Sequence, residues 1–126
     1  MKKFLPVAAI ILSLSSFTLI ASIDEVVNAM QSGNAAQVAR FFDNNVEISM
    51  PDKSNSFSKT QAEIVLKDFF ANNPVKGFKV IHKGENAGSQ YCIGTLATKN
   101  GAFRTTIFMK QKGNAQVLQE LRFENR

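Results

Sequence analysis

The chain has 126 residues, a formal net charge of +5 and 44% hydrophobic residues, with a single cysteine and a single histidine. This length suits one compact domain and excludes two. The lone Cys92 excludes an internal disulfide, and one cysteine with one histidine falls short of the ligand set of a usual zinc site. A modest positive charge and a single tyrosine, without an aromatic ladder for stacking bases, argue against a nucleic-acid partner.

The first segment has the three-part layout of an export signal. Lys2 and Lys3 form a basic start, and an apolar run follows over residues 4–12 before a stretch rich in serine. We predict a signal peptide over residues 1–22, cleaved to leave a single domain over 23–126 in the periplasm or outside the cell. A retained membrane anchor is the alternative, which the interrupting hydroxyl side chains disfavour. We expect the cleaved chain, with its charge lowered to +3, to make no stable membrane insertion.

Three helices are predicted in the first half of the mature chain. Each begins at a residue whose side chain caps free amides, followed three positions later by Glu or Gln. The predicted helices begin at Ser22, at Asn34 and at Ser58 and run to Gly33, to about residue 42 and to about residue 72. Apolar side chains recur at helical spacing in all three.

A strand is predicted between the second and third helices. Val46, Ile48 and Met50 alternate with polar residues, and Pro51 ends the pattern. The polar segment 52–58 that follows is predicted to be a loop.

After Gly77 the apolar pattern changes to a period of two. It predicts four strands in succession, over residues 78–83, 90–99, 102–112 and 116–124. Asn100-Gly101 is a strong signal for a two-residue hairpin turn. The predicted fold is α+β, with three N-terminal helices packed on a curved antiparallel sheet.

The hairpin turn determines which side chains share a face of the sheet. The face assigned to the core carries Cys92, Gly94, Leu96, Thr98, Phe103, Thr105, Ile107 and Met109. The same phase points His82 inward beside Val80. In the last strand it points Val117 inward and Leu118 outward, which requires an odd-length or bulged turn at Gly113.

Polar side chains predicted inside the domain indicate a small-molecule pocket. They are His82, Cys92, Thr105 and Gln119. The alternative is a filled core whose polar groups bond to backbone. We assign no catalytic residue, because His82 has no carboxylate partner in the core phase. An isomerase or dehydratase-type enzyme using His82 is the alternative function.

The opposite face of the sheet carries an apolar patch. It consists of Tyr91, Ile93, Phe108 and Leu118. Such patches often mark association, so we expect a homodimer. A purely structural dimerisation module is the second alternative function.

Several segments carry a family resemblance. They are Ser32-Gly33-Asn34-Ala35, Phe41-Phe42-Asp43-Asn44-Asn45-Val46-Glu47, Leu66-Lys67-Asp68-Phe69-Phe70, Ile93-Gly94-Thr95-Leu96 and Gln119-Glu120-Leu121-Arg122. The mature chain resembles a family of small exported bacterial proteins of unknown function within the nuclear transport factor 2-like (NTF2-like) superfamily.

The resemblance implies a cystatin-like cone whose curved sheet wraps the longest helix, and relatives with this fold commonly dimerise through the sheet. Similar enzymes, such as ketosteroid isomerase and scytalone dehydratase, place catalytic side chains inside the cone, but fold alone does not carry function. We expect an exported, non-catalytic module without cofactor or metal. Its ligand would be a small hydrophobic or amphipathic molecule or another protein.

Overall fold

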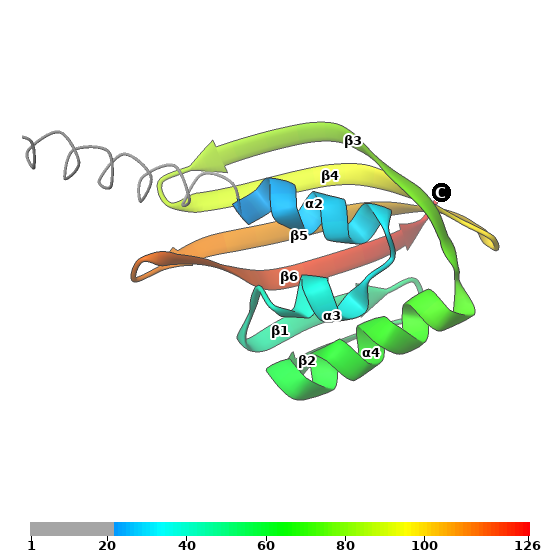
Figure 1. Ribbon diagram of the computed structural model, residues 1–126, viewed down its shortest axis with the longest axis horizontal. Helices are drawn as coiled ribbons and strands as arrows, with labels where there is room; N and C mark the ends of the chain where they lie inside the picture. Colours follow the sequence, from blue (N-terminus) through cyan, green and yellow to red (C-terminus); the bar gives the residue numbers. More distant parts are fainter. Residues whose placement is uncertain (1–21) are drawn as a thin grey trace, which may run out of the picture.

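In the computed structural model, which describes residues 22–126, three helices cover one face of a curved six-stranded sheet (Figure 1). The elements in chain order are α2 (Ser22–Gln31), α3 (Ala35–Ala39), β1 (Phe42–Met50), β2 (Lys53–Ser58), α4 (Lys59–Asn72), β3 (Val75–Asn86), β4 (Ser89–Thr98), β5 (Gly101–Lys112) and β6 (Ala115–Asn125). This arrangement confirms the predicted α+β class. The predicted signal peptide, apart from Ser22, lies outside the described residues, and within 22–126 no helix is long and apolar enough to cross a membrane.

Two of the predicted helix caps are present. The Asn34 side chain accepts a hydrogen bond from the amide of Gln37, and the Ser58 hydroxyl accepts one from the amide of Gln61. Ser22 is already the first described residue of α2, so the cap of that helix lies outside the described residues. The helix α3 is shorter than predicted and ends at Ala39, because the chain enters β1 at Phe42.

The strands lie in the order β2-β1-β6-β5-β4-β3. Neighbouring strands are antiparallel except β1 and β6, which pair in parallel, so the prediction of an all-antiparallel sheet is wrong at that pair. The predicted loop 52–58 is also wrong, since Lys53–Ser58 forms the edge strand β2. Backbone pairing with β1 holds this strand in place. Apart from the half-buried Phe57 its side chains are exposed, so its sequence lacks the alternation of apolar and polar residues that indicates a strand.

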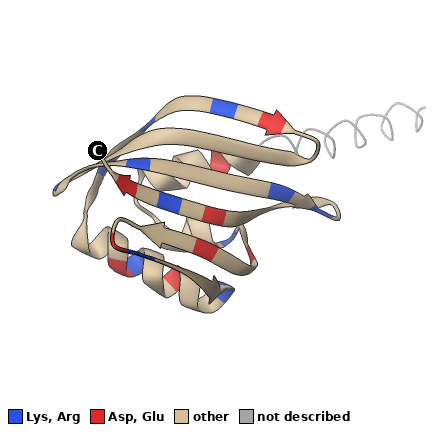
Figure 2. Cartoon of the chain, turned by 180° about the vertical axis from the view of Figure 1, so that it is seen from behind, with Lys and Arg blue, Asp and Glu red and all other residues tan. Residues whose placement is uncertain are grey.

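The core lies between the helices and the face of the sheet that they cover. Leu96, Ile107 and Met109 are fully buried there, in the phase that the hairpin turn predicted. No helix within residues 22–126 covers the other face, and Figure 2 shows positions of acidic and basic residues along its strands.

A register shift in β3 reverses the predicted direction of His82. Val80 pairs with Gly94 and His82 pairs with Ile93, so Ile81 is an extra residue in the strand. His82 is consequently exposed on the outer face, and its predicted inward position is wrong. The same shift turns Lys83 toward α2, where its Nζ lies 2.9 Å from a carboxylate oxygen of Asp24.

A second shift, in β6, reverses Leu118. Phe108 pairs with Glu120 and Met109 pairs with Leu118, which leaves Gln119 without a partner in the ladder. Leu118 is fully buried, so its predicted place on the outer dimer face is wrong. The predicted irregularity exists, but it lies within β6 and not at the Gly113-Asn114 turn, where the pairing is regular.

Candidate functional site

The four predicted pocket residues do not come together. Cys92 and Thr105 are fully buried in the core, whereas His82 lies outside and Gln119 lies at the bulge of β6. The Thr105 hydroxyl donates to the carbonyl of Phe103 at 3.3 Å, as a core hydroxyl satisfied by backbone does. Burial raises the pKa of the Cys92 thiol to about 11, which suits an inert core residue rather than a nucleophile.

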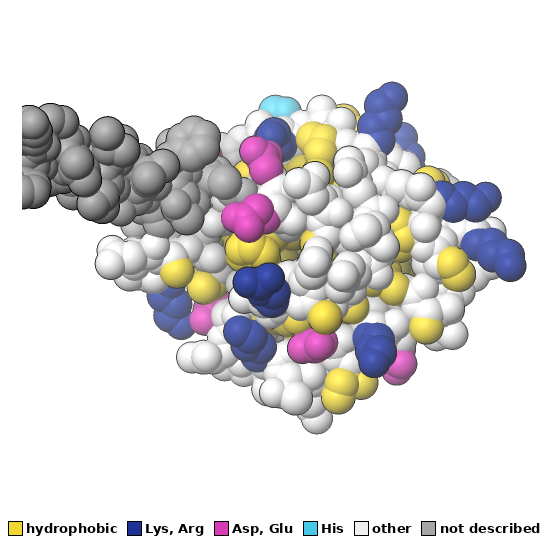
Figure 3. Space-filling model, in the orientation of Figure 1, with side chains coloured by type: hydrophobic (Ala, Val, Ile, Leu, Met, Phe, Trp, Pro, Cys, Tyr) yellow, Lys and Arg dark blue, Asp and Glu magenta, His cyan; other side chains and the backbone are white. Residues whose placement is uncertain are grey.

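His82 pairs with Tyr91 and not with a carboxylate. Its Nε2 lies 2.9 Å from the Tyr91 hydroxyl, and both side chains come from the outer side of the β3–β4 ladder. The chain's one histidine lies at the rim of the molecule, in cyan in Figure 3. An acid–base role for His82 inside the cone therefore has no geometric support.

Gln119 belongs to a polar cluster that fastens β1 to the last hairpin. Its side-chain amide donates to Asp43 at 3.0 Å, and the Lys112 ammonium contacts the other carboxylate oxygen at 2.8 Å. These hydrogen bonds, with one from the backbone amide of Asn44, lower the pKa of Asp43 to about 2. The cluster is a structural clamp at the edge of the core.

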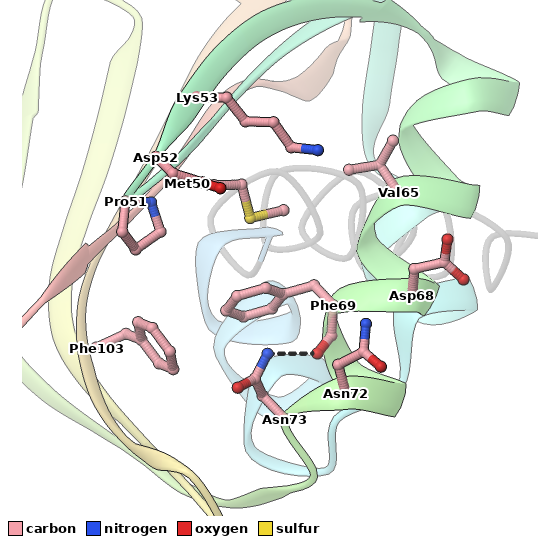
Figure 4. A pocket seen from close by; sticks show the side chains of 10 residues that line it. All are labelled: Met50, Pro51, Asp52, Lys53, Val65, Asp68, Phe69, Asn72, Asn73 and Phe103. Atoms are coloured by element: carbon pink, nitrogen blue, oxygen red, sulfur yellow. Dashed lines mark hydrogen bonds between the residues drawn. The ribbon is translucent and has the colours of Figure 1, made fainter.

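A hollow lined largely by apolar side chains lies between the β1–β2 turn and α4. Its volume is about 550 Å³, and the residues that line it are Met50, Pro51, Asp52, Lys53, Val65, Asp68, Phe69, Asn72, Asn73 and Phe103. In Figure 4 the rings of Phe69 and Phe103 and the thioether of Met50 point into the cleft. We call this hollow the α4 cleft.

Stacked aromatic rings form the floor of the α4 cleft. The ring of Phe69 lies 4.4 Å from that of Phe123 and 5.2 Å from that of Phe103, measured between centroids. Such pairs stabilise by about 0.5–1.5 kcal/mol beyond the area they bury. The floor is therefore apolar and closely packed.

Hydrogen bonds hold the part of the α4 cleft that lies at the end of α4. Asn73 ends α4, and its side chain donates to the carbonyl of Phe69 at 3.0 Å. Asn100, in the predicted hairpin turn, donates to the carbonyl of Asn72 and so joins β4–β5 to the helix. The cleft is held by elements from three parts of the chain.

Charged side chains stand at the rim of the α4 cleft. Lys53 supplies an ammonium from the start of β2, while Asp52 and Asp68 supply carboxylates. An apolar floor with a few polar groups at the mouth suits an amphipathic ligand. Within residues 22–126 no group of three His, Cys, Asp or Glu side chains is placed to hold a metal ion.

The α4 cleft was not predicted, because residues 52–58 were expected to form a loop and in fact form β2, whose first residue lines the cleft. The signal that was available is the stripe of Val65, Phe69 and Asn72, which recurs along one face of α4.

The curved sheet with three helices on one face is an α+β fold similar to that of proteins designed on the NTF2 fold. A designed protein of the Rd1NTF2 series with a long sheet superposes with a TM-score of 0.66, at 17% identity over 83% of this chain and 98% of that chain. Likeness at this identity concerns the fold alone.

The chain belongs to the family described as a domain of unknown function, DUF4783, whose model matches residues 23–124. A crystal structure of a DUF4783 family protein from Bacteroides fragilis is 33% identical, with a TM-score of 0.77 over 81% of this chain and 96% of that one. One from Bacteroides ovatus is 30% identical, with a TM-score of 0.79 over 81% and 93%. The search of curated proteins finds no match to this chain.

Proposed function

We propose that the protein is an exported, non-catalytic binding module that holds a small amphipathic or hydrophobic molecule in the α4 cleft. The observation that carries the proposal is the cleft itself, with its aromatic floor and charged rim. Its volume of about 550 Å³ falls within the range of about 300–1,000 Å³ common for ligand pockets. Export rests on the predicted leader over residues 1–22.

The contacts favour an elongated ligand with one polar end. The apolar part would lie against Phe69, Phe103 and Met50, because these side chains already point into the cleft. The polar end would lie at the mouth, where Lys53 and Asp68 can offer one charge of each sign.

The test compares two neighbouring residues of α4. Val65 lines the cleft, whereas Ile64 is 56% exposed and does not line it. We expect Val65→Arg to lower the affinity for the fluorescent probe 1-anilinonaphthalene-8-sulfonate at least tenfold, because a charged side chain would occupy the apolar space. Ile64→Arg is the matched control and should bind as the unaltered protein does.

Native mass spectrometry of the protein purified from its own host completes this test. A retained small molecule that Val65→Arg loses and Ile64→Arg keeps would support the proposal. Equal probe binding by both variants, or no binding by the unaltered protein, would overturn it.

A second candidate function, homodimerisation, is supported by the uncovered face of the sheet (Figure 2). Tyr91, Ile93 and Phe108 are half-buried there, and Val117 takes the place that was predicted for Leu118. Beside them two ion pairs lie on the strands. Arg104 Nε is 3.8 Å from Glu124 Oε1, and Arg122 Nη2 is 2.8 Å from Glu120 Oε2. A two-fold axis would bring such mixed charges of one copy against opposite charges of the other.

Light scattering coupled to size-exclusion chromatography tests this candidate. Phe108→Glu should convert a dimer to a monomer, because it places a charge in the middle of the apolar face. Ile81→Glu is the control, since Ile81 is 55% exposed at the bulge of the edge strand. A mass unchanged by Phe108→Glu would refute the interface.

A further inference from the structure

A row of polar side chains crosses the helix-covered face of the sheet near the β3–β4 and β5–β6 turns. The row takes one residue from each of four strands, namely Glu85, Gln90, Gln111 and Gln116. Glu85 pairs with Gln90, and Gln111 pairs with Gln116. Gln90 pairs with the fully buried Met109, so the row borders the core directly. We call these four residues the polar row.

A second hollow lies beside the polar row. Its volume is about 330 Å³. The four residues of the polar row form one part of its lining, and the other part is the β3–β4 turn with Asn86, Ala87, Gly88 and Ser89. It shares no lining residue with the α4 cleft. The turn is held in place, because the carbonyl of Gly88 accepts a hydrogen bond of 2.7 Å from the backbone amide of Gln111.

The side-chain oxygens of two glutamines in the polar row are buried without a hydrogen-bond partner. Among residues 22–126, Gln90 Oε1 and Gln116 Oε1 are the two buried side-chain nitrogen or oxygen atoms that make no hydrogen bond. The third amide differs, because Gln111 donates to the carbonyl of Gly113 at 3.2 Å. An acceptor removed from water without a new hydrogen bond is costly, so two beside one hollow indicate a missing donor.

We propose that this hollow binds a hydroxyl-rich small molecule such as a monosaccharide. A carboxamide offers both a carbonyl oxygen and an NH₂ group, and a sugar hydroxyl can donate to the one and accept from the other. The lining contains one carboxylate, Glu85, and no aromatic ring, which disfavours both a metal ion and a flat apolar ligand. The site is independent of the α4 cleft and of its proposed ligand.

The experiment titrates the ¹⁵N-labelled mature protein with D-glucose, D-galactose and N-acetyl-D-glucosamine and follows its amide resonances. One of these sugars should shift the side-chain amides of Gln90 and Gln116 and the backbone amides of residues 86–89. Gln90→Met and Gln116→Met keep the length of the side chain but remove its hydrogen-bonding groups. Each should weaken binding at least tenfold, whereas Gln37→Met, at an exposed position of α3, should not.

Thermal unfolding of the same variants separates a binding role from a structural one. Because Gln90 Oε1 and Gln116 Oε1 accept no hydrogen bond from another group of residues 22–126, both methionine variants should keep or raise the Tm of the protein. A lowered Tm in both would show that the amides serve packing and would overturn the proposal. So would the absence of any shift at sugar concentrations that saturate a millimolar site, or binding that both variants retain.

Discussion

Replacing Asp43 with asparagine should lower the free energy of unfolding at neutral pH and have no effect in acid. Asp43→Asn keeps the size of the side chain and removes the charge that Lys112 contacts. A pKa lowered from 3.8 to about 2 corresponds to about 2.4 kcal/mol, at about 1.36 kcal/mol for each tenfold change in proton affinity. Lys112 is 58% exposed, and screening by water reduces the expected loss to about 1–2 kcal/mol.

The pH dependence of this loss follows from the direction of the shift. A carboxyl group whose pKa is lower in the folded state stabilises the fold fully above its unfolded pKa of 3.8, and the contribution is lost as the pH falls through the folded pKa of about 2. Urea unfolding of the two proteins at pH 7 and pH 2 measures it. Asp68→Asn, which removes an exposed charge from α4, controls for the change in net charge. A difference of the same size at both pH values would refute the reasoning.

Two other substitutions test the core. Gly94→Ala should lower stability by about 1–3 kcal/mol in thermal unfolding, because a Cβ there would lie 2.5 Å from Phe78 Cζ and 2.7 Å from the Lys79 carbonyl. Gly77→Ala, where a Cβ meets nothing within 4 Å, should be neutral, and equal effects at both sites would contradict the packing. The Cys92 thiol should resist Ellman's reagent at pH 8 in the folded protein and react fully in denaturant, since burial raises its pKa to about 11. Rapid reaction of the native protein would be inconsistent with that burial.

The elements whose boundaries were predictable are those with local chemical signals. Ser58 caps α4 through its own side chain, and a two-residue turn ends β4 close to the predicted place, at Lys99-Asn100 and not at Asn100-Gly101. These signals act within a few residues of the chain, so the sequence alone carries them. The strand β2 lacks such a signal, because pairing with β1 and not burial of its side chains holds it in place.

The two bulges were not predictable, for a common reason. Each falls where two apolar residues are adjacent, Val80 beside Ile81 and Val117 beside Leu118, so either phase of alternation gives a plausible core. Shifting a strand by one residue moves every later side chain to the opposite face. The error at His82 therefore removed the predicted pocket, and the α4 cleft is instead made by residues that meet only after α4 packs beside the β1–β2 turn.

The parallel pairing of β1 with β6 makes the order of chain synthesis matter. Strand β1 is joined to β5, β4 and β3 only through β6, which lies between β1 and β5. Without Ala115–Asn125 the sheet would separate into a two-stranded and a three-stranded fragment, and contacts between such distant segments form slowly. A growing chain of this design therefore cannot complete its six-stranded sheet until Ala115–Asn125 has been synthesised.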